Sequence, residues 1–279
     1  MCDAALARLP LGDRTVESLC DGHFERERRT FFRNAEDHPS EVTTLQLAVR
    51  AFLVRAPAYT ALIDSGLGTQ AHRLAALDGS GETLPERLRQ LGVASTDVDL
   101  VVYTHLHFDH FGSIGTPEQP TFPLAEHYMS RREFVHWRGR PGPHGEAVAE
   151  LVDPFVEAGA VRFVDETVEL REGLIVSIAD GHTPGHLTVR CTGSSGSCVF
   201  IGDLLHHPTQ ITTPELSPNA DEDPELAESR RWEHLSLLAS TGWAAASPHL
   251  MPGPYWTVQN RHDRFTATSL VPQRGPEQR

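Results

Sequence analysis

The stretch 103–112, Tyr-Thr-His-Leu-His-Phe-Asp-His-Phe-Gly, constrains this chain more than any other feature. It follows the mostly apolar run 98–103 and places four potential metal ligands within six positions: His105, His107, Asp109 and His110. Side chains alternate along an extended segment, so the first two histidines point the same way. A turn at Phe108 would then present the next two ligands from a different direction. Because imidazole is the commonest protein ligand for divalent metals, the stretch is predicted to serve two neighbouring ions.

Three further candidate ligands lie far away in the sequence, each just past an apolar run. His186 follows the run 174–178 within Asp-Gly-His-Thr-Pro-Gly-His, Asp203 follows 198–202, and His249 follows 243–248. Such runs are typical of buried strands, and sites at strand ends collect side chains from distant parts of a chain. A solvated histidine loop is the alternative interpretation, and four separate strand-end placements favour the metal site.

This constellation resembles the metallo-β-lactamase superfamily, and the resemblance covers roughly residues 42–270. The matching residues are the seven candidate ligands in the family's order, together with Gly185 and the turn Ile63-Asp64-Ser65-Gly66. The resemblance implies a four-layer αββα sandwich, whereas periodicity alone would give only an α/β or α+β class. Such a motif set specifies the fold and a dinuclear site far better than it specifies a substrate.

The resemblance also implies a role for each ligand. His105, His107 and His186 would bind the first ion, Asp109, His110 and His249 the second, and Asp203 both, together with a water or hydroxide. Two divalent ions are expected, zinc first, with manganese, iron or cobalt as substitutes. Each ion lowers the pKa of bound water toward about 7. Asp109 is also predicted to handle protons, Asp64 to bind the free ring N–H of a ligating histidine, and His182 to be structural or supporting.

His206, three positions after Asp203, is the candidate for direct contact with substrate. Acyl-homoserine lactonases carry a tyrosine at this place, so the segment Gly202-Asp203-Leu-Leu-His206 with Gln210 is closer to the methyl parathion hydrolase branch than to those quorum-quenching enzymes. Packing at a helix end is the alternative interpretation of His206 and His207.

The resulting functional prediction is a hydrolase that uses a metal-bridging hydroxide on a small-molecule lactone or carboxylic ester. A thioesterase or phosphotriesterase of the same fold, possibly in a biosynthetic pathway, is the alternative. An iron-dependent redox enzyme is disfavoured by His107, since iron-containing relatives carry glutamate at one loop histidine. A nuclease is disfavoured by charge, and a non-catalytic binding protein by the seven ligand positions.

Composition supports these exclusions. The net charge of −14 argues against a nucleic-acid surface, because phosphate binding needs clustered cations. There is no 18-residue apolar run and no apolar signal core at the N-terminus, so we expect no membrane span and a cytoplasmic location. A dimer is compatible with the sequence. Cys191 and Cys198 flank Thr-Gly-Ser-Ser-Gly-Ser and are expected to face each other across a hairpin as free thiols.

The pattern along the chain predicts one domain over 1–279. Strands are expected at 15–20, 42–64 (interrupted at 56–58), 98–104, 125–130, 161–164, 167–170, 174–180, 187–192, 198–202, 243–247, 255–259 and 264–269. Helices are expected at 82–91, 145–158 and 222–241. Residues 22–41 are polar but contain Phe24, Phe31 and Phe32. They are predicted to be either a surface loop or an active-site flap, and residues 273–279 a frayed tail.

Overall fold

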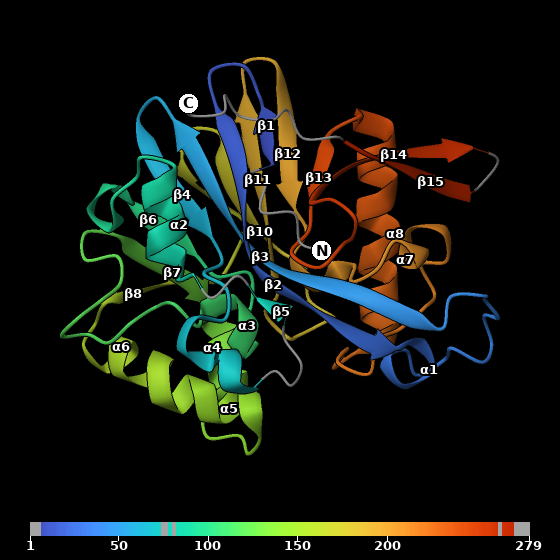
Figure 1. Cartoon of the computed structure of the whole chain (residues 1–279), viewed down its shortest axis with the longest axis horizontal. Helices are drawn as coiled ribbons and strands as arrows, with labels where there is room; N and C mark the ends of the chain where they lie inside the picture. Colours follow the sequence, from blue (N-terminus) through green and yellow to red (C-terminus); the bar gives the residue numbers. More distant parts are fainter. Residues whose placement is uncertain (1–6, 74–77, 80–81, 262–263, 271–279) are drawn as a thin grey trace.

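The structure, a computed structural model, describes residues 7–73, 78–79, 82–261 and 264–270. Over this part of the chain two β-sheets pack face to face, and helices cover their outer sides (Figure 1). The first sheet has the strand order β1-β2-β3-β4-β6-β7-β8, with β5 paired to β2. The second has the order β15-β14-β13-β12-β11-β10-β9. The mixed α/β class with two sheets is confirmed.

The strands of the first sheet are β1 Arg8–Pro10, β2 Thr15–Glu27, β3 Thr44–Ala56, β4 Tyr59–Ile63, β5 Asp78–Gly79, β6 Leu100–Val102, β7 Glu126–Ser130 and β8 Val161–Val164. Those of the second are β9 Val168–Arg171, β10 Leu174–Ile178, β11 Leu187–Gly193, β12 Gly196–Phe200, β13 Ala244–Ala246, β14 Tyr255–Arg261 and β15 Arg264–Ser269. β6 runs parallel to β4 and β7, and β12 runs parallel to β13.

The helices are α1 Arg28–Phe31, α2 Leu84–Gln90, α3 Phe108–Phe111, α4 Arg131–Trp137, α5 Pro143–Ala147, α6 Asp153–Glu157, α7 Thr209–Thr212 and α8 Pro224–Thr241. Short 3₁₀ turns occur at Gly68–Arg73, Ser95–Asp97 and Gly202–Leu204, and a π-helical turn at Val148–Val152. α2 begins with a capping box between Thr83 and Glu86, and Asp223 caps α8. Among the described residues no helix is both long and apolar enough to cross a membrane.

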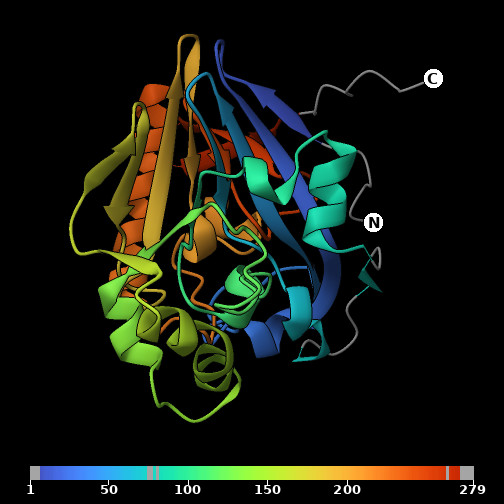
Figure 2. The ribbon, with the colours of Figure 1, turned by 90° about the vertical axis from the view of Figure 1, so that its left-hand side faces the viewer.

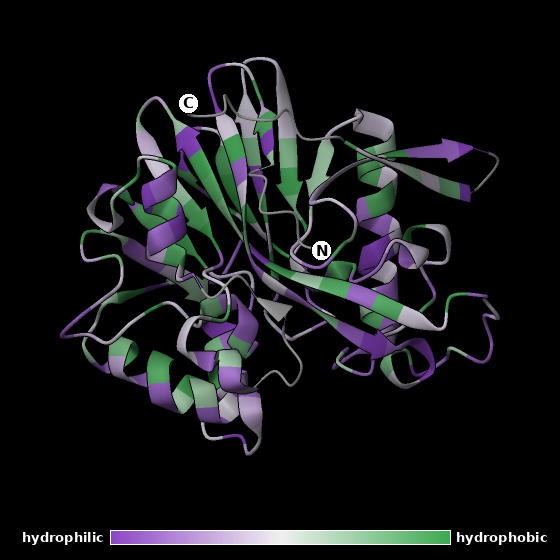
Figure 3. Ribbon diagram, in the orientation of Figure 1, coloured by the Kyte–Doolittle hydropathy of each residue, from purple (hydrophilic) through white to green (hydrophobic). Residues whose placement is uncertain are grey.

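Three clusters of buried apolar side chains pack between the layers. The central cluster joins the two sheets, with Phe52 of β3 packed against Phe200 of β12 and Tyr255 of β14. The second lies outside the first sheet and includes Leu88 of α2, and the third lies outside the second sheet and includes Leu235 of α8. Figure 2 shows α8 and α2 on opposite outer sides of the sheets, and Figure 3 shows the apolar strands between them.

Several sequence expectations need correction. The helix predicted for 145–158 is divided into α5, the π-helical turn and α6, because Pro154 has no N–H to donate to the preceding turn. Residues 22–27 continue β2 and 28–31 form α1, so the first half of the polar segment is regular structure. α4 was not predicted, and the tail 273–279 lies outside the described residues.

The hairpin of β11 and β12 agrees with the cysteine prediction. Its register places Cys191 directly opposite Cys198, and both are buried, free thiols. Burial raises the pKa of Cys191 to about 11, which makes its thiol a poor nucleophile.

Candidate metal centre

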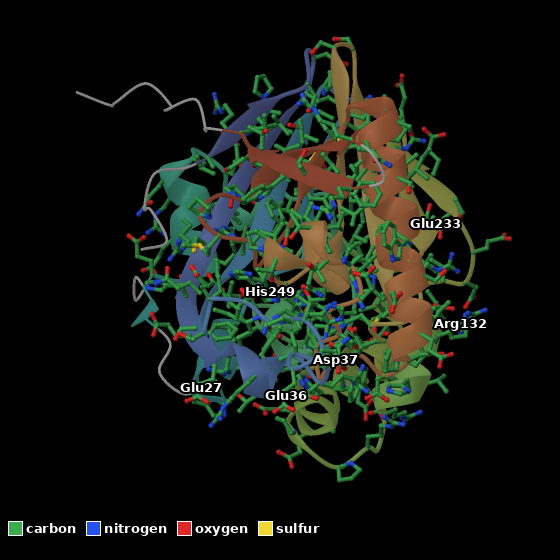
Figure 4. The ribbon with its side chains drawn as sticks, turned by 90° about the vertical axis from the view of Figure 1, so that its right-hand side faces the viewer. Glu27, Glu36, Asp37, Arg132, Glu233 and His249 are labelled. Atoms are coloured by element: carbon green, nitrogen blue, oxygen red, sulfur yellow. The ribbon has the colours of Figure 1, made fainter. Side chains whose placement is uncertain are left out.

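The candidate ligands gather at one end of the sandwich, where β6, β10, β12 and β13 finish. The segment 105–110 follows β6, His182 follows β10, Asp203 follows β12, and His249 follows β13. Figure 4 shows His249 inside the molecule, between β2 and α8 in that view, whereas Glu27 and Glu233 lie at the periphery. Strand ends from both sheets therefore supply the site.

The first group of donor atoms contains three histidines and one carboxylate: His105, His107, His182 and Asp203. Their potential ligand atoms all lie within 4.8 Å of one another, and all four residues are buried. His107 Nδ1 is 3.2 Å from His182 Nε2. Asp203 Oδ2 is 3.6 Å from His105 Nε2 and 3.5 Å from His182 Nε2.

The second group contains Asp109, His110 and His249. Asp203 Oδ1 is 3.3 Å from His110 Nε2 and 3.2 Å from His249 Nε2. Asp109 Oδ2 is 3.8 Å and 3.7 Å from the same two nitrogens. The Asp109 side chain is 15% exposed, more than the other members of the two groups, so it lies on the side open to solvent.

One expected ligand is replaced by another residue. His186 is outside both groups, because its Nε2 accepts the backbone N–H of Asp203 at 3.0 Å. In the first donor group His182 lies where we expected His186, and His186 contacts the Asp203 turn instead. The chain turns at Thr183 and enters β11 at Leu187, which directs the His186 ring beneath the Asp203 turn.

The other ring nitrogen of several histidines is occupied by a protein group. Asp64 Oδ2 lies 2.9 Å from His110 Nδ1, which is the ring contact predicted for Asp64. Asp64 has a φ of 60° and also accepts the N–H and hydroxyl of Thr104. His249 Nδ1 lies 2.6 Å from the carbonyl oxygen of Ala48. These contacts fix the ring orientation and leave Nε2 facing Asp203.

His182 is held in the same way by an ion pair. Its Nδ1 lies 2.9 Å from Asp221 Oδ1, and Arg231 of α8 donates to Asp221 Oδ2 at 2.9 Å. All three side chains are buried. The positive charge of Arg231 offsets the negative charge of the buried Asp221. The same contact holds the Asp221 carboxylate in place against the His182 ring.

Electrostatics at the first donor group favour neutral imidazoles beside an ionised carboxylate. In the second group neighbouring carboxylates, Asp203 first, outweigh burial and raise the pKa of His110 and of His249. Burial lowers the pKa of His105 and of His107 well below the usual range. Burial opposes ionisation of Asp203, but the surrounding histidines, His249 first, outweigh it and hold the pKa of that carboxyl well below its usual range. Neutral imidazole and carboxylate are the protonation states that bind a metal ion.

The donor set fits two divalent metal ions. Three buried polar atoms that have no hydrogen-bond partner within the described part of the chain converge here, namely His105 Nε2, His110 Nε2 and Asp203 Oδ1. A buried polar atom left unpaired is costly, so three in one place indicate a missing partner. Imidazole and carboxylate donors together suit zinc and similar transition metals.

Aromatic and imidazole rings border the second group. His206 stacks on His249 with ring centroids 5.4 Å apart, and its Nε2 is 3.1 Å from Asp203 Oδ2. Phe31 of α1 meets the His206 ring edge-on at 5.4 Å. On the other side, His144 stacks on His107 at 4.0 Å. No motif marked His144, because α5 alone brings it to the site.

The segment that carries Phe31 is fastened to a distant loop. Arg33 N–H donates to the carbonyl oxygen of Ser217, and Asn219 N–H donates to that of Phe31. The Asn34 amide donates to the Glu215 carbonyl oxygen and accepts from the Ser217 N–H. Residues 31–34 therefore form a fixed wall beside His206 in this structure.

Comparison with known proteins identifies the family. The model described as the Metallo-beta-lactamase superfamily matches residues 45–240. This chain belongs to the metallo-β-lactamase superfamily.

Solved structures of the superfamily have the same fold. The hydrolase AbOPH aligns with a TM-score of 0.82 and 24% identity over 97% of this chain and 99% of its own. AidC, a dizinc quorum-quenching lactonase, aligns with a TM-score of 0.80 and 20% identity over 96% and 98%.

Curated relatives match a smaller part of the chain. A probable metallo-hydrolase of Mycobacterium tuberculosis is 26% identical over 184 residues, and the match spans 58% of each protein. An N-acyl homoserine lactonase of Bacillus thuringiensis is 26% identical over 199 residues, which are 66% of this chain and 74% of that protein.

Proposed function

We propose that this protein is a dinuclear metal-dependent hydrolase that acts on small-molecule lactones or carboxylic esters. The observation that carries the proposal is the position of Asp203 between the two groups of donor atoms. Its Oδ2 is 3.6 Å from His105 Nε2, its Oδ1 is 3.3 Å from His110 Nε2, and both oxygens are 3.2 Å from His249 Nε2. A carboxylate in this position suits two neighbouring cations, because it offsets part of their mutual repulsion. The lactonases among the similar proteins support the choice of substrate class.

Each residue of the two donor groups has a proposed role. His105, His107 and His182 would hold the first ion, Asp109, His110 and His249 would hold the second, and Asp203 would contribute to both. Zinc is the first candidate, and manganese, iron or cobalt are substitutes. When bound, such ions supply a water of lowered pKa and polarise a carbonyl oxygen. Asp109, the most exposed of these ligands, takes up or returns a proton on the substrate side.

His206 lies beside the second donor group, against His249 and Asp203. Its buried Nδ1 has no hydrogen-bond partner among the described residues, and we assign this atom to a polar group of the substrate. Its Nε2 faces Asp203, which fixes the ring. The adjoining Phe31 ring offers an apolar surface to the rest of a small organic substrate.

The test is a hydrolysis panel with elemental analysis. Lactones, carboxylic esters, thioesters and phosphotriesters are each offered to the metal-loaded protein, the metal-free protein and the Asp203→Asn variant. We expect about two metal ions per chain and metal-dependent turnover of a lactone or carboxylic ester. Turnover confined to thioesters or phosphotriesters would replace the substrate class, and metal-free protein as active as the loaded form would refute the proposal.

A further inference from the structure

A buried carboxylate outside the donor groups contacts both loops that carry the histidines of the first donor group, His105, His107 and His182. Glu133 lies in the first turn of α4 and is 0% exposed. Its Oε2 accepts the backbone N–H of Leu106 and the indole N–H of Trp137, both at 3.0 Å. Its Oε1 accepts the backbone N–H of Gly185 at 3.0 Å. Both carboxylate oxygens are therefore used.

The hydrogen-bond partners of Glu133 lie next to the histidines of the first donor group. Leu106 stands between His105 and His107, and Gly185 belongs to the loop that begins at His182. Trp137 packs against the His107 ring with centroids 5.3 Å apart. One carboxylate is thus linked to the segments of all three histidines, which come from distant parts of the sequence.

Close packing leaves these loops little freedom. A Cβ atom added at Gly185 would lie 2.4 Å from Ser130 Oγ and 2.7 Å from Glu133 N, so the loop contacts the start of α4 directly. Burial raises the pKa of the Glu133 carboxyl, and hydrogen bonding by Thr183 first, then by Leu106, Gly185 and Trp137, opposes that rise. An ionised carboxylate accepts hydrogen bonds and donates none, which matches three N–H donors.

We propose that Glu133 is a positioning residue that holds His105, His107 and His182 at the distances a metal ion requires. The inference rests on the proposed function, in which these three histidines bind one ion. Glutamine is nearly isosteric but places an NH₂ group against at least one of the three N–H donors. The Glu133→Gln variant therefore loses the link to one loop without leaving a cavity.

The experiment titrates metal-free protein with zinc or cobalt and measures both binding steps. Changes to groups that orient metal ligands typically cost about 10–100-fold in metal affinity. We expect Glu133→Gln to weaken one step by that factor and leave the other within about threefold of the wild type. The control is Glu166→Gln, which removes the same charge from an exposed side chain and should bind as the wild type does. The cobalt absorption spectrum should change in Glu133→Gln alone.

Trp137→Phe keeps an aromatic ring on His107 and removes one hydrogen bond, so it tests the same link if Glu133→Gln does not fold. We expect it to weaken the same step by a few fold. Wild-type affinities for both steps in folded Glu133→Gln, or in Trp137→Phe if that is the variant that folds, would overturn the positioning role and leave the proposed function intact. A wild-type protein that binds no metal would instead refute the proposed function.

Discussion

At the scale of single residues, Asp203 and the histidines around it form the centre of the candidate site. Asp203 Oδ2 faces His105 and His182, Oδ1 faces His110, and His249 lies 3.2 Å from both oxygens. Asp203 can do this because it sits in a short turn after β12, with its N–H bonded to His186. His182 and His186 therefore have different tasks, although they stand four positions apart.

This difference between His182 and His186 predicts that only one of two matched substitutions weakens metal binding. His182→Gln removes a ring nitrogen from the first donor group, so we expect at least about 100-fold weaker binding of one metal ion and a comparable loss of rate. His186→Gln retains an acceptor for the Asp203 N–H and should keep both ions. Metal content after dialysis distinguishes the variants, and loss of metal from His186→Gln but not His182→Gln would restore the assignment made from sequence.

The proposed contact between His206 and the substrate is tested by comparing substitutions at His206 and His207. We expect His206→Ala to keep both metal ions and to lose on the order of 10²-fold in rate, because a contact made in the transition state is gone. His207→Ala is the control, since His207 Nδ1 is engaged with Thr209. Steady-state kinetics and elemental analysis give the answer. Loss of a metal ion from His206→Ala would make His206 a ligand, and an unchanged rate would make it a packing residue.

At the scale of secondary-structure elements, the turn after β12 depends on Gly202. This residue has a φ of +49°, and a Cβ atom there would lie 2.4 Å from His186 Nε2. Gly242, which ends α8, has a φ of +69° but open space around the position of a Cβ atom. A substitution at Gly242 therefore tests backbone strain alone, whereas the same substitution at Gly202 tests strain together with a steric clash at the site.

We expect Gly242→Ala to cost about 1 kcal/mol of unfolding free energy, from strain alone, with both metal ions retained. Gly202→Ala adds the collision with His186, which displaces the Asp203 turn, and should lose metal as well as stability. Denaturant unfolding and metal content, measured on both variants, check this. Equal metal content in Gly202→Ala and Gly242→Ala would show that the turn adapts without moving Asp203.

Elements with a clear period or cap were predictable from sequence. The strands 161–164 and 174–178 and the capped α2 are examples, and so is the placement of His105, Asp203 and His249 just past strands. The choice between His182 and His186 was not, because both histidines follow the same strand and only the return of the chain into β11 orients them. α4 was missed because it is short, and with it Glu133, whose importance depends on backbone groups of two distant loops.

At the scale of the whole molecule, the site joins the two halves of the sandwich. The segment 105–110 follows a strand of the first sheet, whereas His182, Asp203 and His249 follow strands of the second. Each metal ion would therefore tie the two sheets together at one end. The central cluster around Phe52, Phe200 and Tyr255 joins the same sheets independently of metal.

Removal of metal is accordingly expected to lower stability without unfolding the protein. A ligand present at 100 times its dissociation constant stabilises the native state by about 2.7 kcal/mol. Since about 1 kcal/mol corresponds to roughly 2–4 °C in a protein approaching this size, chelation should lower the unfolding temperature by about 5–10 °C for each ion at that saturation. Calorimetry of chelated protein, with zinc restored to half of each sample, measures the shift. His182→Gln should show a smaller shift than the wild type, because it binds one ion poorly. An unfolding temperature that is the same with and without metal would mean that the ions do not join the two sheets.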